Sequence, residues 1–154
     1  MEENKSIRNT SEDKKNYSKK IDEKVRSKSL TKSGGSKFKK YCDFFVGKRS
    51  FLAFLKYEII TCLFANCPGA AGIFLRGIFY RFLLKKVGKG VSCGKNIVFR
   101  HPNKIVLGNN VVIDDNCMLD AKGDTNDGII IEDGVFIGRN TILSCKDGDI
   151  SLRE

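Results

Sequence analysis

Apolar residues recur every six positions along the second half of the chain. The register begins at Val87 and restarts at Leu107, Ile131 and Leu152. A spacing of six differs from both the alternation of a half-buried strand and the 3.6-residue period of a helix. It predicts coils of short strands, each turning an apolar side chain inward, that stack as a mainly β, parallel β-helix of about three coils over residues 87–154. The predicted core consists of Val87, Val91, Cys93, Ile97, Leu107, Val111, Ile113, Cys117, Leu119, Ile131, Val135, Ile137 and Leu143.

The corners of the predicted coils have a signature of their own. Three positions after the apolar residue of a regular hexad, the chain carries only Gly or Asn. These residue types adopt positive φ most readily, so each is predicted to turn the chain through a left-handed conformation. The six positions are Gly90, Asn96, Asn110, Asn116, Gly134 and Asn140.

The third hexad of each coil is followed by an irregular polar stretch. These stretches are residues 100–104, 120–128 and 144–149, and we call them together the polar ridge. Because each follows the same face of a coil, they are predicted to stack, and insertions on one face of a solenoid often form its binding surface. The candidate functional residues of the ridge are His101, Arg100, Lys104, Lys122 and Lys146.

Residues 44–86 are strongly apolar, with isolated charges, and Pro68-Gly69 interrupts them. This pattern predicts two helices, at about 50–65 and about 70–85, joined by a turn. Neither approaches the roughly 18–20 apolar residues that cross a bilayer. Two arrangements remain open: the hairpin packs on the β-helix, or it lies in the membrane interface with its Lys and Arg side chains reaching water.

Residues 1–43 are predicted to be a disordered basic tail, because they carry too few apolar side chains to bury. The net charge of +10 resides in the first half of the chain, since residues 87–154 carry −2. No aromatic residues interleave with the basic ones as in RNA-binding segments, so no nucleic-acid partner is predicted. The N-terminal residues have no apolar core behind their charges, so no secretory signal is predicted. A cytoplasmic protein is expected, with peripheral contact to the inner face of the membrane as an open option. The six cysteines show no metal-binding spacing, so neither a metal nor a disulfide framework is predicted.

The hexads at 87–92, 107–112 and 137–142 resemble those of the hexapeptide-repeat acyltransferases. Residues from about 50 to 154 look most like the acetyltransferases of bacterial surface-polysaccharide clusters. The resemblance implies a left-handed β-helix and a homotrimer with its active site between subunits, where acetyl-CoA gives its acetyl group to a sugar hydroxyl. It also implies a His that removes the proton of that hydroxyl and cationic side chains that attract the acidic cosubstrate, here Arg100, Lys104, Lys122 and Lys146.

The surface-polysaccharide acetyltransferases carry their catalytic His in a later coil. The chain is therefore expected to be an N-terminal portion of such an enzyme, with little or no activity alone. His101 is the sole histidine, and its Arg-His-Pro context is similar to a loop of the serine acetyltransferases. Catalysis by His101 is weighed against a structural role at a corner beside Pro102.

Other functions are known for β-helical proteins and are weighed against the same repeat. A γ-class carbonic anhydrase needs three zinc-binding histidines, which one His cannot supply. A nucleotide-sugar enzyme would place a Gly-rich phosphate loop ahead of the repeats, and none is present. A non-catalytic scaffold or trimerisation module remains the alternative. The acidic pair Asp114-Asp115 lacks the calcium-binding nonapeptide, so a solvated loop is expected there.

Overall fold

The computed structural model describes residues 37–123 and 126–153, so most of the expected tail lies outside the described residues. The helices are α2 (Lys37–Tyr41), the π-helix η1 (Cys42–Val46), α3 (Phe51–Phe64), α4 (Gly69–Leu83) and the 3₁₀ helix η2 (Pro102–Lys104). The strands are β1 (Lys86–Val87), β2 (Ser92–Cys93), β3 (Val98–Arg100), β4 (Ile105–Leu107), β5 (Val112–Ile113), β6 (Met118–Asp120), β7 (Ile129–Ile131), β8 (Phe136–Ile137), β9 (Ile142–Ser144) and β10 (Ile150–Leu152).

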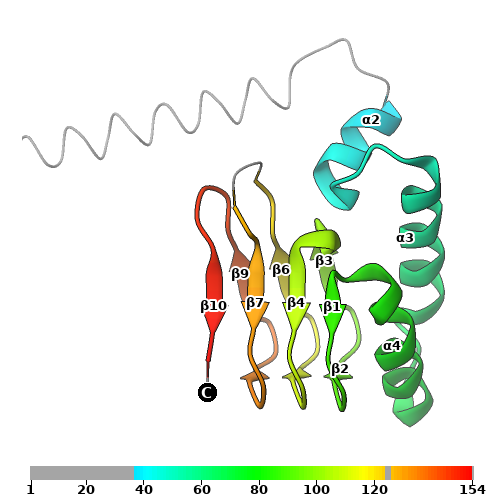
Figure 1. Cartoon of the computed structure of the whole chain (residues 1–154). Helices are drawn as coiled ribbons and strands as arrows, with labels where there is room; N and C mark the ends of the chain where they lie inside the picture. Colours follow the sequence, from blue (N-terminus) through cyan, green and yellow to red (C-terminus); the bar gives the residue numbers. More distant parts are fainter. Residues whose placement is uncertain (1–36, 124–125, 154) are drawn as a thin grey trace, which may run out of the picture. The chain divides into compact units, whose positions relative to one another are not determined.

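These strands form three parallel sheets, in the orders β1-β4-β7-β10, β2-β5-β8 and β3-β6-β9. Every pairing is parallel and joins a strand to the strand three places later in the chain. The chain therefore visits each sheet once per coil. This is a parallel β-solenoid of about three coils, the fold that the six-residue register predicts (Figure 1).

The corners of the coils adopt the predicted left-handed conformation. All six Gly and Asn positions have positive φ, namely Asn96 (55°), Asn110 (55°), Asn116 (60°), Asn140 (60°), Gly90 (67°) and Gly134 (75°). A second glycine requirement arises where coils touch. A Cβ on Gly88 would lie 2.3 Å from the Gly108 carbonyl oxygen one coil later. The hexad thus encodes both the turn and the close stacking of the coils.

The predicted core is confirmed. Ten of its thirteen residues are buried, and Val87, Val91 and Leu143 are half-buried. Val87 and Val91 belong to the first coil, and Leu143 lies on β9, which pairs only with β6. Burial is incomplete there because a coil at either end of the stack has a neighbouring coil on one side only.

Helices α3 and α4 cover the first coil at the end of the solenoid opposite β10 (Figure 1). The Tyr57 hydroxyl of α3 donates a 2.8 Å hydrogen bond to the Phe99 carbonyl, and the Tyr80 ring of α4 packs edge-on against the Phe99 ring. The Asn96 N–H donates to the Ala65 carbonyl at 2.8 Å. The hairpin therefore packs on the β-helix through one side of each helix. Among the described residues, no helix combines the length and apolarity needed to cross a bilayer.

Helix α2 and part of η1 lie within the segment that the sequence assigns to a tail ending at residue 43. They form because aromatic side chains anchor them to α3. The Phe38 and Tyr41 rings lie 5.2 and 5.5 Å from the Phe54 ring, centroid to centroid. The Tyr41 hydroxyl also donates a hydrogen bond to the Glu58 carboxylate. Two aromatic residues three positions apart are too few to give a periodic signal, so their contact with α3 was not predictable from local pattern.

Candidate functional site

The described residues of the three irregular stretches lie at one corner of the solenoid, as predicted, whereas Asp124 and Thr125 lie outside the described residues. Arg100 pairs with Asp120, and Asp120 pairs with Ser144, so the stretches begin at matching positions of stacked strands. Successive coils are 20, 24 and 21 residues apart. Each step exceeds three hexads, and the extra residues fall in the ridge.

Lys104 holds the ridge together. Its Nζ donates to the Gly123 carbonyl at 2.6 Å, to the Asn126 carbonyl at 3.0 Å and to the Asn126 side-chain oxygen at 2.9 Å. An ammonium group has three N–H donors, and Lys104 uses all of them. The Asn126 side-chain amide then donates to the Lys146 carbonyl at 3.1 Å, which ties in the third stretch. In this conformation Lys104 is a structural residue with no donor left for an anionic ligand.

Arg100 and Lys122 clamp η1 onto the ridge. The Arg100 guanidinium carbon lies 4.8 Å from the centroid of the Phe44 ring, and Lys122 Nζ lies 4.1 Å from the same centroid. Both distances are within the range of cation–π attraction. Arg100 Nη1 also lies 3.3 Å from Asp120 Oδ2. The aromatic side of this contact, Phe44, was not among the residues predicted for the site.

His101 lies beneath η1. Its φ of 54° is left-handed, its backbone N–H donates to the Phe45 carbonyl at 2.8 Å, and the residue is 8% exposed. A Cβ on Gly47 would lie 2.4 Å from His101 Cδ2, so only glycine fits at that point of the η1 end. His101 begins η2 at a corner beside Pro102, although its imidazole makes no capping hydrogen bond.

Burial lowers the pKa of His101 below its ordinary value, and the nearby Asp120 carboxylate opposes part of that effect. A neutral imidazole is the form that accepts a proton, so the environment favours the base. His101 Nδ1 has no hydrogen-bond partner, and neither do the buried Arg100 Nε and Asn103 Oδ1 beside it in sequence. The lowered pKa of His101 favours its neutral imidazole, and η1 restricts access to it.

Lys146 differs from the other candidates because its side chain is about half exposed. Its Nζ lies 3.9 Å from Asp147 Oδ2, a long and solvated ion pair. The structure thus brings Arg100, His101, Lys104 and Lys122 together at the ridge, where contacts within the chain occupy the three cations. It leaves the Lys146 ammonium accessible on the same ridge.

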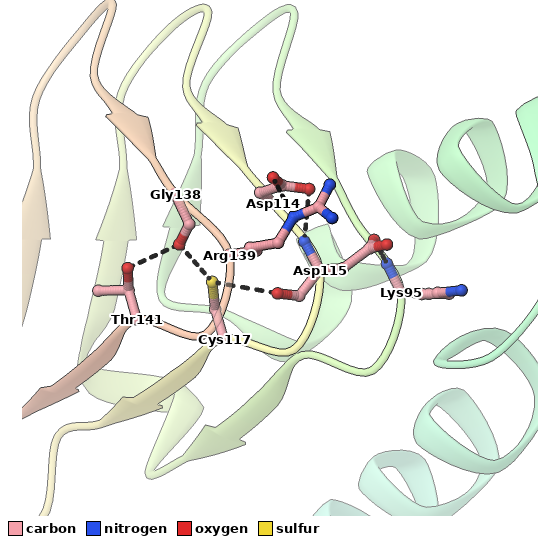
Figure 2. A network of polar contacts seen from close by, with 7 residues as sticks. All are labelled: Lys95, Asp114, Asp115, Cys117, Gly138, Arg139 and Thr141. Atoms are coloured by element: carbon pink, nitrogen blue, oxygen red, sulfur yellow. Dashed lines mark hydrogen bonds and ion pairs between the residues drawn. The ribbon is translucent and has the colours of Figure 1, made fainter.

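A different corner of the solenoid carries a second set of polar contacts (Figure 2). Lys95, in the preceding coil, donates its backbone N–H to Asp115 Oδ1 at 2.8 Å. Arg139, in the following coil, places its Nε 3.2 Å from Asp114 Oδ2. The Asp115 N–H, with Arg139, lowers the pKa of the Asp114 carboxyl. These two carboxylates therefore serve to join coils. Within the described part of the chain, no group of three or more His, Cys, Asp or Glu residues is placed to hold a metal ion.

Arg76 is a buried cation that sequence reasoning missed. It lies within α4, is 2% exposed, and donates only to carbonyl oxygens. Nε donates to Cys93 of β2 at 2.9 Å, and Nη1 donates to Cys67 at 2.7 Å and to Phe64 at 3.3 Å. Phe64 and Cys67 lie at the C-terminal end of α3, where carbonyls lack helical partners and a cation is favoured. Arg76 therefore joins both helices to the first coil.

Two surface cavities flank the sheets away from the ridge. One of about 450 Å³ lies between the start of α4 and the β2-β5-β8 sheet, and its lining includes Ile73, Lys95 and Phe136. The other, of about 760 Å³, lies along β1, β4 and β7 and includes Asn109 and Arg153. None of the predicted site residues lines either cavity.

Comparisons of the chain with protein-family models, curated proteins and solved structures find no significant match.

Proposed function

We propose that this chain is an acyltransferase of the hexapeptide-repeat class that moves an acetyl group from acetyl-CoA to a sugar hydroxyl of a surface polysaccharide. The observation that carries the proposal is the hexad itself. Its inward apolar residue and its Gly or Asn at positive φ recur through the coils of a parallel solenoid. The same hexads underlie the resemblance to acyltransferases, and with it a left-handed coil, a homotrimer and a cytoplasmic location.

In the proposed reaction His101 removes the proton of the acceptor hydroxyl. The oxygen then attacks the thioester carbonyl of acetyl-CoA and forms a tetrahedral intermediate. As the intermediate collapses, the carbon–sulfur bond breaks, the CoA sulfur takes the proton from the imidazolium, and the sugar acetate ester remains. The lowered pKa of His101 and its unpartnered Nδ1 support this role. Since His101 is 8% exposed, the reaction requires η1 to move away from it.

A non-catalytic β-helical scaffold is the second candidate, and the engagement of the ridge favours it. Lys104 donates its three N–H groups to Gly123 and Asn126. Arg100 and Lys122 make cation–π contacts with Phe44. A ridge so occupied contributes rigidity rather than ligand contacts. The two candidates differ in whether the chain binds acetyl-CoA.

The decisive experiment measures release of free CoA thiol from acetyl-CoA with a panel of mono- and oligosaccharide acceptors. His101→Asn is the informative variant because Asn tolerates the left-handed backbone at this position while lacking a base. Little or no turnover is expected from this chain alone, because the acetyltransferases that it resembles carry their catalytic His in a later coil. Turnover that falls at least a hundredfold in His101→Asn, with an unchanged urea midpoint, would overturn that expectation and make His101 the base. Equal turnover in the two chains would remove His101 from the mechanism. Absence of both turnover and acetyl-CoA binding, the latter measured by calorimetry, would favour the scaffold.

A further inference from the structure

The outer face of the α3–α4 hairpin is apolar and exposed. Helix α3 buries Tyr57 and Ile60 toward the solenoid, and α4 buries Tyr80 and Leu83 there. Large apolar side chains that remain exposed on the other side of these two helices are Phe51, Leu52, Leu55, Ile59, Leu63, Phe74, Ile78 and Phe82, and we call them the outer face. Ile73 is also exposed but lines the cavity between α4 and the solenoid. Leu52 and Phe74 are 75% and 69% exposed. An exposed apolar patch spread over two helices marks an interaction surface.

The outer face points away from the solenoid on both helices. Leu55, Ile59 and Leu63 follow one another at four-residue spacing, which places them on one side of α3. That side is not the one occupied by Tyr57 and Ile60. The same contrast holds on α4, where Phe74 and Ile78 are exposed and Tyr80 is buried. Both helices are too short to span a bilayer, so any membrane contact would place them flat in the interface.

Exposed cationic side chains are frequent in the segments that carry and flank the outer face. Across residues 37–86 the exposed basic residues are Lys37, Lys39, Lys40, Lys48, Arg49, Lys56, Arg81, Lys85 and Lys86. The Phe38 ring lies 6.4 Å from the Phe51 ring, which brings the lysines of α2 beside the start of α3. In the same span the acidic residues are Asp43, paired with Arg49, and Glu58, which accepts the Tyr41 hydroxyl.

We propose that the outer face docks on the surface of an anionic lipid bilayer. The apolar side chains enter the boundary between headgroups and acyl chains, and the exposed Lys and Arg side chains of these segments meet lipid phosphates. Charge complementarity selects this occupant. Pairing two outer faces in a dimer would bring nine exposed cations of one chain against nine of another, whereas an anionic surface neutralises them.

Vesicle flotation of the full chain tests the proposal with vesicles of phosphatidylcholine alone and of phosphatidylcholine with about a third phosphatidylglycerol. The test variant is Leu52→Ser/Phe74→Ser, which removes two exposed apolar side chains from the outer face. The matched control is Phe136→Ser/Ile142→Ser, which removes two side chains of similar exposure (66% and 67%) from strands of the solenoid. Far-UV circular dichroism and urea midpoints confirm that the variants remain folded.

We expect the wild-type chain and the control to float with the anionic vesicles and to partition at least tenfold less onto phosphatidylcholine alone or in 0.5 M salt. The test variant should lose at least tenfold in partitioning onto anionic vesicles. Failure of the wild-type chain to float with anionic vesicles overturns the proposal, as does an equal loss in test and control variants. A wild-type dimer by light scattering that Leu52→Ser/Phe74→Ser converts to monomer, without vesicle binding, would assign the outer face to a second copy.

Discussion

Replacement of Arg76 by Met probes the contact that joins the helical hairpin to the first coil. Met retains an unbranched stem of similar length and removes the guanidinium. The substitution leaves the Cys93 and Cys67 carbonyls without the donors that now lie 2.9 and 2.7 Å away. Arg76 is 2% exposed, but Cys67 and Arg76 also line the cavity of about 450 Å³ beside α4, so water there replaces part of what is lost.

The expected loss follows from these two short bonds. A hydrogen bond to a charged group contributes about 1.5–3 kcal/mol. We adopt the lower figure, because Arg76 lacks a carboxylate partner and its desolvation offsets part of the gain. The 3.3 Å bond to Phe64 is neglected. Two bonds then give a decrease of about 3 kcal/mol in the free energy of unfolding, or about 10 °C in Tm for a domain of this size.

Urea unfolding of the full chain, followed by far-UV circular dichroism, measures this loss. Arg81→Met is the matched control, since Arg81 lies on the same helix, is exposed, and donates only a 3.2 Å bond to the Gly88 carbonyl. Its expected cost is below about 0.5 kcal/mol. Equal losses in the two variants would refute the assignment of Arg76 as the residue that fastens the hairpin.

Two further predictions concern the core and the ridge. Ile137→Asp should prevent folding because it buries a carboxylate among stacked aliphatic side chains. Phe136→Asp changes the preceding residue, which is 66% exposed, and should keep the native circular dichroism spectrum. Similar spectra for the two variants would contradict the prediction that Ile137 points inward. Burial lowers the pKa of His101 below 6.5, so the unfolded chain binds more protons and stability should fall as the pH drops through about 6.5. His101→Asn should weaken this dependence, as measured by urea midpoints at pH 7.5 and 5.5, and an unchanged dependence would show that other groups cause it.

The hexad made the solenoid predictable in detail. Each corner depends on one residue with positive φ. Because Asn adopts that conformation more readily than most residues, the positions of Asn96 and Asn140 predict it from residue type alone. Each inward position depends on one apolar side chain, so burial at Ile113 and Ile137 follows from the spacing. The stacking of the ridge was predictable for the same reason, because every interruption follows the same face.

The contacts between segments were not predictable from these patterns. Arg76 binds carbonyls that come from the end of α3 and from β2, and a carbonyl carries no residue-type signal. The cover of η1 over His101 depends on Phe44 meeting Arg100 and Lys122, which lie 56 and 78 positions away in the chain. Such contacts form only once the solenoid has brought distant stretches of the chain together, so the local sequence period does not predict them.

The uneven length of the coils has a consequence for how the chain tolerates change. Successive coils differ by up to four residues, 20 against 24, yet the strands on either side keep their pairing because the difference is confined to one corner. A residue added inside a hexad would instead turn every following inward side chain of that strand toward solvent. Insertions and deletions during evolution should therefore accumulate between β6 and β7 while the hexads keep their length. The same segment is where an engineer would graft a foreign peptide, with Lys104 and Asn126 fastening the base of the loop that displays it.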